Sequence, residues 1–239
     1  MGTKLIKDIQ VSCSNCSLDT ICLPRGLSAT EVNNLSEAVE RKKILQRGDY
    51  IYHEGDKFKG ILAIKSGTAK LARTDHHGNE HILNILLPGE LLGFDGFYDN
   101  THNCSAIALE TLTFCELPAE DLETLSLKVP GLMRELFRHT GKTLNNDRDQ
   151  LVLNKRPAEE RLAWFLVNLS ERYNERGFSA AEFTLSLTRQ EIGNHLGLAL
   201  ETVSRLLKQF QNLKLVSVNN RHIKLLNIED LERLYKESK

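Results

Sequence analysis

The apolar pattern of residues 44–117 is typical of short β-strands separated by turns. Runs of β-branched, aromatic and aliphatic residues alternate with eight glycines between Gly48 and Gly96. Short strands with glycine turns at such intervals predict an antiparallel β-barrel or jelly roll. The predicted strands cover residues 50–53, 61–64, 68–73, 81–87, 104–109 and 112–117.

The segments on either side of these strands have helical periodicity instead. Ser28 and Glu31 form a capping-box pattern that predicts a helix through Leu35 and Val39. The helical pattern returns at Pro118, and after Pro130 apolar residues recur with the alternating steps of four and three that define a coiled-coil seam. The seam consists of Met133, Phe137, Thr140, Leu144, Asp147 and Leu151.

The seam has two interpretations. An ordinary helix would pack against its own barrel, as we expect for its first half, and Gly141 weakens the heptad pattern. Asp147 is a poor core residue, however, so its place on the apolar stripe favours a dimer contact. We therefore predict a dimerisation helix, with a solvent-exposed Asp147 as the alternative.

The remaining chain predicts a winged helix-turn-helix. Pro157 is expected in the first turn of a helix that residues 176–178 end, and residues 183–187 predict a strand. Thr188 and Glu191 form a second capping box, Gly197 makes a turn, and a second helix follows. Residues 214–218 and 222–226, joined at Asn219-Asn220, predict the hairpin wing.

These elements together predict an α+β chain with four parts. They are an N-terminal cysteine-rich segment (1–27), a β-barrel sensor domain (28–128), a dimerisation helix and hinge (129–156) and a DNA-binding domain (157–239). The 239 residues, 41% hydrophobic and 26% charged, suffice for two compact domains. Neither a signal peptide nor a membrane span is evident, so we expect a cytoplasmic protein.

The charge distribution indicates where nucleic acid would bind. The formal net charge of −1 argues against nonspecific binding by the whole surface. Residues 189–224, however, carry six basic residues against two acidic ones, a local charge of +4, whereas residues 74–127 contain neither Lys nor Arg. This asymmetry suggests two tasks for two regions.

One face of the second predicted helix carries side chains that can read bases. Glu201, Ser204 and Arg205 share that face at positions i, i+3 and i+4. Arg can donate two bonds to guanine, and Glu can accept one from cytosine. The alternative is a solvated face with a Glu201–Arg205 ion pair, but the local positive charge favours DNA. Basic residues that can contact phosphates nearby are Arg189, Lys208, Lys214 and Arg221.

Three of the five cysteines, Cys13, Cys16 and Cys22, fall within ten residues. This density predicts a loop that wraps thiolates around zinc, copper(I) or an iron–sulfur cluster. A structural zinc site would normally add a second close pair, so the pattern favours a cluster. A disulfide framework is the weaker alternative in so long a chain. Either Cys104 or Cys115 could supply the fourth ligand.

Several of these motifs together resemble the FNR branch of the CRP/FNR transcription regulators. The similarity rests on the cysteine run and on residues 89–95 (GELLGFD), 158–162 (AEERL) and 201–205 (ETVSR). It implies a cyclic-nucleotide-binding-like barrel, a dimerisation helix and a winged helix-turn-helix. It also implies an oxygen-labile [4Fe-4S] cluster whose ligands match Cys13, Cys16, Cys22 and Cys115.

The same resemblance implies how such a protein would act. A cluster-bearing homodimer would control anaerobic gene expression with RNA polymerase as a partner. Glu201, Ser204 and Arg205 would read an inverted repeat containing TTGAT.

The sequence favours a cluster-bearing regulator over three other functions. A cyclic-nucleotide receptor needs an arginine for the phosphodiester, yet residues 102–105 (HNCS) occupy the place where nucleotide binders of the family carry one. We therefore expect no cyclic nucleotide. His76, His77 and His81 are interpreted as solvated residues of a hairpin tip, and we expect no enzyme because no catalytic pattern stands out. A CRP-like regulator that senses another ligand or redox signal without a cluster is the remaining alternative.

Overall fold

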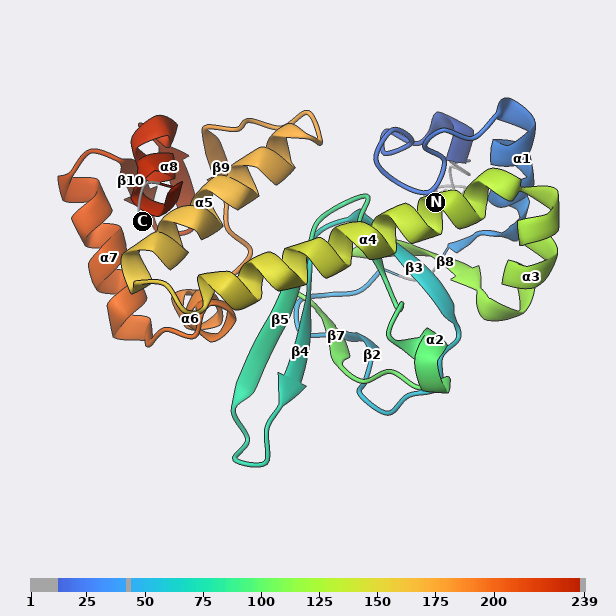
Figure 1. Ribbon diagram of the computed structural model, residues 1–239, viewed down its shortest axis with the longest axis horizontal. Helices are drawn as coiled ribbons and strands as arrows, with labels where there is room; N and C mark the ends of the chain where they lie inside the picture. The colour runs from blue at the N-terminus through green and yellow to red at the C-terminus, as the bar shows by residue number, and fades with distance from the viewer. Residues whose placement is uncertain (1–12, 42–43, 237–239) are drawn as a thin grey trace, which may run out of the picture.

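The structure is a computed structural model that describes residues 13–41 and 44–236. A β-barrel domain and a mixed helix–sheet domain lie side by side, and the long helix α4 (Pro130–Leu153) runs along both (Figure 1). This arrangement confirms the predicted α+β fold.

The barrel consists of two four-stranded antiparallel sheets, with strand orders β1-β8-β3-β6 and β2-β7-β4-β5. The six predicted strands are all present within two residues of their expected bounds. The two-residue strands β1 and β6 were not predicted, because so short a run carries no period. The strands are β1 Glu40–Arg41, β2 Tyr50–Tyr52, β3 Gly60–Ser66, β4 Ala69–Thr74, β5 Glu80–Leu86, β6 Leu91–Leu92, β7 Ser105–Ala108 and β8 Thr113–Pro118.

Short helices close the end of the barrel nearest the N-terminus. The Ser28 capping box is present, because Ser28 Oγ accepts from the Glu31 amide and the Glu31 carboxylate accepts from the Ser28 amide. Leu35 of α1 is fully buried against the barrel and α3. These elements are the 3₁₀ turn η1 Cys13–Asn15, α1 Ala29–Ala38, α2 Gly96–Asp99 and α3 Ala119–Lys128.

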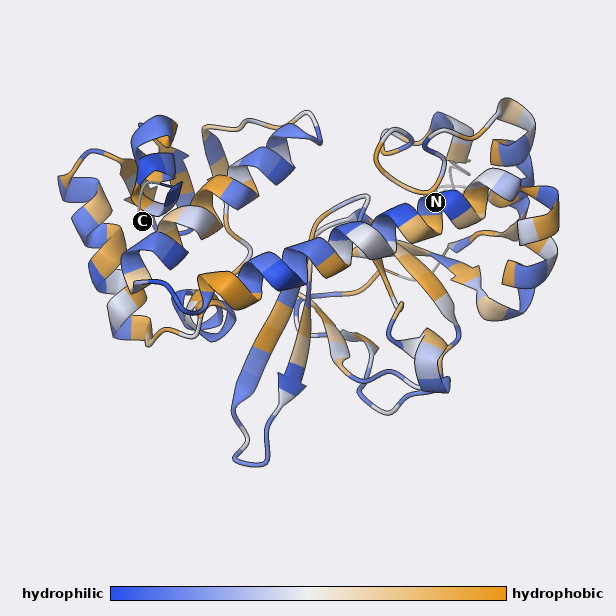
Figure 2. Cartoon of the chain, viewed as in Figure 1, coloured by the Kyte–Doolittle hydropathy of each residue, from blue (hydrophilic) through white to orange (hydrophobic). Residues whose placement is uncertain are grey.

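Helix α4 has two apolar faces. Leu132, Leu136 and His139 are buried, the two leucines in the apolar core at the end of the barrel. The seam lies on a neighbouring face, where Phe137 is 70% and Leu151 66% exposed. The first half of α4 thus packs on its barrel, as expected, but through different residues from those of the seam. Apolar residues recur along the whole helix in Figure 2.

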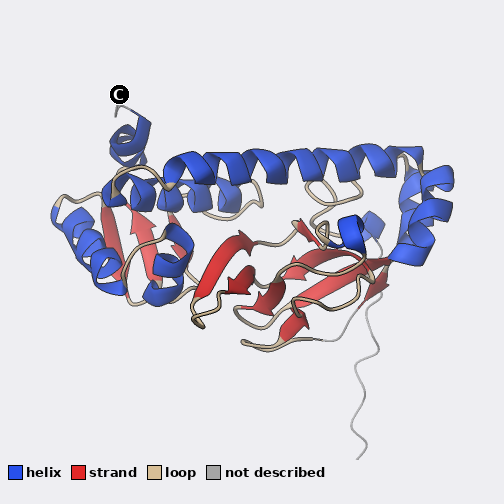
Figure 3. Ribbon diagram, turned by 60° about the horizontal axis from the view of Figure 1, so that its bottom comes forward, coloured by secondary structure: helices blue, strands red, loops and turns tan. Residues whose placement is uncertain are grey.

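The C-terminal domain has the predicted winged helix-turn-helix order. Its elements are α5 Ala158–Asn174, β9 Glu182–Thr184, α6 Arg189–Leu196, α7 Leu200–Asn212, β10 Val216–Asn219, β11 His222–Leu225 and α8 Ile228–Lys236. The three strands form one sheet in the order β10-β11-β9, flanked by helices (Figure 3).

Local details of this domain differ from the sequence-based expectations. Pro157 is the N-cap of α5 and lies one residue before its first turn. The wing turn consists of residues 220–221 and not of Asn219-Asn220, because Asn219 belongs to β10 and pairs with His222. Asn220 takes a positive φ of 57° in this turn. Helix α8 was not predicted.

The barrel and the C-terminal domain share one core. Ile82 and Ile85 of the barrel belong to the same buried cluster as Phe165 and Leu166 of α5. The predicted boundary at residue 157 therefore separates two units whose apolar surfaces are continuous.

Charged side chains add to this junction. Glu191 of α6 accepts hydrogen bonds from Arg47 at 3.0 Å and from Lys70 at 3.2 Å. These contacts hold the first helix of the helix-turn-helix against the barrel. Among the described residues, no helix is both long and apolar enough to cross a membrane.

Candidate cysteine centre and nucleic-acid interface

Residues 13–26, the cysteine segment, form consecutive tight turns. The amide of Cys16 donates to the Cys13 carbonyl, and the amide of Cys22 donates to the Leu18 carbonyl at 2.8 Å. The Cys13 amide donates to Ser36 Oγ at 2.9 Å, which fixes the start of the segment on α1. The chain thus folds back on itself so that its three thiols face the barrel.

Four cysteines meet at one place, which we call the cysteine hollow. Cys13, Cys16 and Cys22 line it from the segment, and Cys115 lines it from β8. Its other walls are mainly aliphatic: Leu18, Leu23, Pro24, Leu35, Val39, Ala63, Ile64 and the stem of Lys65. Tertiary structure therefore brings Cys115 to the cysteine segment across 93 residues of sequence.

Cys104 lies elsewhere. Its side chain is buried in a separate apolar cluster with Leu62 and Ala106, and its Sγ donates to Asp95 Oδ2 at 3.7 Å. Burial raises the pKa of this thiol to about 12, with the nearby Asp95 charge as a further cause. Cys104 therefore behaves as a buried thiol and lines no part of the cysteine hollow.

The environment of the hollow favours the neutral form of the Cys22 thiol. Burial raises the pKa of Cys22 to about 12, and the neighbouring Cys115, Cys13 and Cys16 raise it further. A bound metal centre must therefore displace a proton from Cys22, because the thiolate is the ligand. Four such thiolates in an apolar pocket match the donor set of an iron–sulfur cluster.

The donor chemistry of the hollow fits an iron–sulfur cluster. Four Cys thiolates are the donor set that holds a [4Fe-4S] cluster, and four cysteines line the hollow. Within residues 13–41 and 44–236, no group of three or more Cys, His, Asp or Glu side chains is arranged as a site for a metal ion.

The cysteine segment contacts the barrel, and the residues that follow it contact α4. A Cβ placed on Gly89 would come within 2.7 Å of Ile21 Cδ1, so the segment lies directly on this barrel turn. The Gly131 amide of α4 donates to Glu31 Oε1 at 3.1 Å, and a Cβ at Gly131 would meet Leu27. Leu27 follows the segment directly and so connects it to the first turn of α4.

The recognition face of α7 is open to solvent. Glu201 and Arg205 are exposed and Ser204 is half-buried, whereas Val203 and Phe210 on the opposite side are fully buried. Within the described part of the chain, neither Glu201 nor Arg205 forms an ion pair or side-chain hydrogen bond. The alternative of a solvated Glu201–Arg205 ion pair is therefore not formed. Both side chains are free to contact a ligand.

Residues expected to contact phosphates are accessible to solvent. Lys208, Lys214 and Arg221 are exposed, and the half-buried Arg189 is the first residue of α6. The turn between α6 and α7 is tight, because a Cβ at Gly193 would approach the Leu198 carbonyl oxygen to 2.4 Å. This turn holds α6 close to the start of α7.

At residues 102–105, where nucleotide binders of the family carry an arginine, His102 is buried against the protein's own side chains, and it lines a cavity of about 550 Å³ together with Tyr52. His102 is 4% exposed, stacks on Tyr52 with ring centroids 3.6 Å apart, and lies 3.2 Å from Asp95. His76 and His77 lie in the exposed turn between β4 and β5, and His81 of β5 pairs with Asp75 at 3.0 Å. The histidines of this turn thus have the surface positions expected from sequence.

Sequence reasoning missed a buried ion-pair cluster at the junction of the domains. Arg172 and Arg176 of α5 donate to the Glu90 carboxylate at 2.6 and 2.7 Å. Burial opposes ionisation of Glu90, but the two arginines outweigh it and hold the pKa of Glu90 below its ordinary value. The sequence does show that Arg172 and Arg176 lie four positions apart and so share one face of a helix. It does not show their partner, because Glu90 is more than 80 residues away.

Comparison with known proteins follows the same division into parts. Residues 42–128 match the family model of the cyclic nucleotide-binding domain, and residues 160–234 match that of the Crp-like helix-turn-helix domain. The structure resembles that of FixK2 from Bradyrhizobium japonicum, with a TM-score of 0.75 and 26% identity over 82% of this chain and 96% of that one.

Curated relatives share the whole length. The anaerobic regulatory protein of Aggregatibacter actinomycetemcomitans is 42% identical over 97% of this chain and 93% of its own. The fumarate and nitrate reduction regulatory protein of Escherichia coli is 40% identical over 97% of this chain and 95% of its own. The chain therefore belongs to the FNR branch of the CRP/FNR family of DNA-binding transcription regulators, which are not enzymes.

Proposed function

We propose that this protein is an oxygen-responsive regulator of anaerobic gene expression that depends on a [4Fe-4S] cluster. The observation that carries the proposal is the convergence of Cys13, Cys16, Cys22 and Cys115 on one apolar hollow. The names of the relatives, which refer to anaerobic regulation and to fumarate and nitrate reduction, support it. The protein would act in the cytoplasm, with RNA polymerase as a partner and without a cyclic nucleotide.

The four cysteines would hold the cluster, which when bound supplies an oxygen-labile centre. The residues around it limit access of solvent. Leu18 and Leu23 are each less than a tenth exposed and cover the hollow from the segment side. Such apolar neighbours set how readily oxygen and water reach a metal centre.

Signal transfer from the hollow to DNA would pass through α4. The cysteine segment lies on Gly89, and Leu27 and Glu31 connect the chain that follows it to Gly131, so its position would be coupled to the first turn of α4. The exposed seam would pair with that of a second chain, because a row of exposed large apolar side chains favours burial in an interface. The homodimer would then present two α7 helices to a TTGAT-type inverted repeat.

The test is to purify the protein without oxygen and measure iron, acid-labile sulfide and binding to an inverted-repeat duplex. We expect about four iron and four sulfide per chain, the number in a [4Fe-4S] cluster. Exposure to air should remove the visible absorbance and weaken specific DNA binding. Iron-free anaerobic protein that binds the duplex equally well in air would instead favour a CRP-like regulator without a cluster.

Replacing Asp147 with Ala is expected to raise the dimer fraction of the cluster-free protein. In a parallel homodimer each Asp147 would face its copy, and burial raises the pKa of this carboxyl even in the single chain, which means that its charge is already disfavoured. Removal of the like charges should therefore promote pairing and restore part of the DNA binding in air. Sedimentation velocity over a range of concentrations measures the effect.

The control for this prediction is Asp149→Ala, which removes the same charge at an exposed position outside the seam. It should leave the dimer fraction unchanged. If Asp147→Ala stays as monomeric as the parent protein, the obstacle to dimerisation lies elsewhere on α4.

A further inference from the structure

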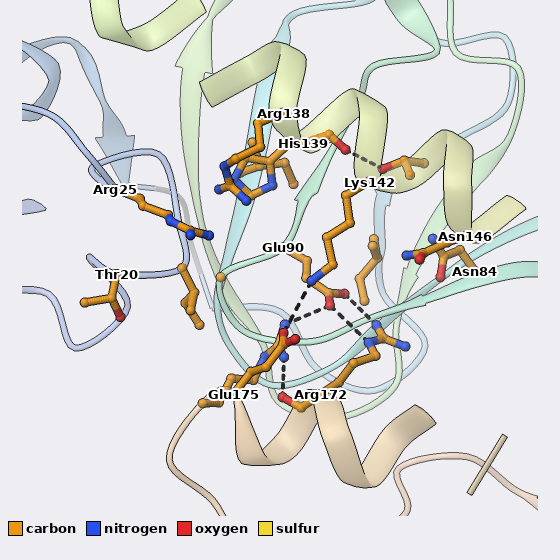
Figure 4. A pocket seen from close by; sticks show the side chains of 16 residues that line it. Thr20, Arg25, Asn84, Glu90, Arg138, His139, Lys142, Asn146, Arg172 and Glu175 are labelled. Atoms are coloured by element: carbon orange, nitrogen blue, oxygen red, sulfur yellow. Dashed lines mark hydrogen bonds and ion pairs between the residues drawn. The ribbon is translucent and has the colours of Figure 1, made fainter. Parts of the chain in front are cut away.

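A second cavity, separate from the cysteine hollow, lies where four parts of the chain meet. Its volume is about 390 Å³, which is within the range of small-molecule sites. Its walls come from the cysteine segment, the β5–β6 region of the barrel, the middle of α4 and the end of α5 (Figure 4). No role in the cluster or in DNA contact accounts for this cavity.

The walls of this cavity carry an excess of positive charge. Five cationic side chains line it against two carboxylates, Glu90 and Glu175. The cations are Arg25, Arg138, Lys142, Arg172 and Arg176. Figure 4 shows Arg25 and Lys142 directed into the cavity from two different walls. Like charges converging in a partly enclosed space repel, and an anion would relieve that repulsion.

Not all of these cations are neutralised by the protein. Arg172 and Arg176 are held by Glu90, and Arg138 donates to Glu135 at 2.6 Å. Lys142 has only a 3.3 Å contact with Glu175, in which both side chains are about half exposed. Arg25 forms no hydrogen bond or ion pair with any described residue. Two cations of the cavity are therefore available to a ligand.

Neutral donors and a neutral histidine complete the lining. Thr20, Asn84 and Asn146 contribute hydroxyl and amide groups. His139 Nε2 lies 3.0 Å from Arg138 Nη2, which can donate to it. Hydroxyl, amide and cationic groups thus line the cavity together, as in sites that bind oxyanions.

We propose that this cavity binds a small organic phosphate, with Arg25 and Lys142 as its principal contacts. Guanidinium groups match the geometry of phosphate oxygens, and a flexible lysine adds a point charge. More than one phosphate group suits the spread of cations over separate walls. The site includes Gly89, Glu90 and Leu91 of the motif at residues 89–95, and it is separate from the cavity that Tyr52 and His102 line in the barrel.

The position of the cavity gives the ligand a structural role. Arg25 belongs to the cysteine segment, Lys142 to α4 and Arg172 to the helix that begins the DNA-binding domain. A phosphate compound in contact with all three would tie these parts together. The site requires no bound cluster, so it can be tested independently of the proposed oxygen response.

The experiment titrates full-length protein with pyrophosphate and with adenosine triphosphate by isothermal calorimetry, at constant ionic strength set with chloride. We expect saturable binding with a dissociation constant below about 1 mM, and a rise in melting temperature with ligand concentration. The double variant Arg25→Ala/Lys142→Ala should bind at least about tenfold more weakly, because two charge-assisted contacts are lost.

Matched controls make the result decisive. The variant Arg73→Ala/Lys128→Ala removes the same charge from surface positions outside the cavity and should bind as the parent does. The single variant Lys142→Ala changes only α4 and leaves the cysteine segment as it is. It should weaken binding of the phosphate compound and leave the iron content of the protein unchanged. Absence of saturable binding, or equal weakening in the control double variant, would overturn the proposal.

Discussion

Replacing Cys115 with Ser is expected to prevent stable assembly of an iron–sulfur cluster. A serine hydroxyl is a hard and weakly acidic ligand, whereas iron–sulfur clusters are held by thiolates. Cys115 is the one cysteine of the hollow that comes from the barrel, so without it the cysteine segment loses its covalent link, through the cluster, to β8. Iron and sulfide in anaerobically purified protein should fall to near background.

The same outcome is expected for Ser at Cys13, Cys16 or Cys22. The matched control is Cys104→Ser, which makes the same atomic change in a different apolar cluster beside Asp95. Cys104→Ser should retain the iron and sulfide of the parent, with a modest loss of stability of about 1 kcal/mol for a buried polar substitution. Loss of the cluster from Cys104→Ser, and its retention in Cys115→Ser, would reverse the ligand assignment.

Replacing Arg205 with Ala is expected to weaken specific DNA binding by about 1–3 kcal/mol, or roughly fivefold to 150-fold. Arg205 is exposed on α7 and is not occupied by Glu201 or any other described residue, so it can make both of its hydrogen bonds to a guanine. Loss of a base contact should also relax the preference at one base pair of each half-site. Binding curves on the inverted repeat and on single-base variants measure both effects.

The comparison variant is Lys208→Ala, which lies on the same helix and is exposed as well. A phosphate contact carries no sequence information, so this change should weaken specific and random duplexes to a similar extent and reduce the salt dependence. If Arg205→Ala instead lowers affinity equally for specific and random DNA, Arg205 contacts phosphate and the bases are read by other residues.

The order of the elements could be predicted from the sequence because each carries its own period or cap. The capping boxes at Ser28 and Thr188 are present as predicted, since the two residues of each box lie three positions apart and need no distant partner. The same reason explains the failures. Strands β1 and β6 have two residues each and depend on β8 and β3 for their existence.

The candidate site was only partly predictable. The run of Cys13, Cys16 and Cys22 indicated a ligand loop by its spacing, and the i, i+3, i+4 pattern put Glu201, Ser204 and Arg205 on one face. Residue patterns by themselves left Cys104 and Cys115 as equal candidates for the fourth ligand. The fold puts Cys115 at the hollow and Cys104 in another cluster, because β8 pairs with β1 and β3 in one sheet whereas Cys104 directly precedes β7 of the other sheet.

The sequence by itself determined the local elements, the cysteine spacing and the charge of the recognition helix, all of which depend on residues close together in the chain. Tertiary structure alone decided which face of α4 packs on the barrel, and it left the seam exposed. It also decided the pairing of Glu90 with two arginines of α5 and the convergence of cations at the second cavity. The Glu90 pairs join residues more than 80 positions apart, and no local period encodes them.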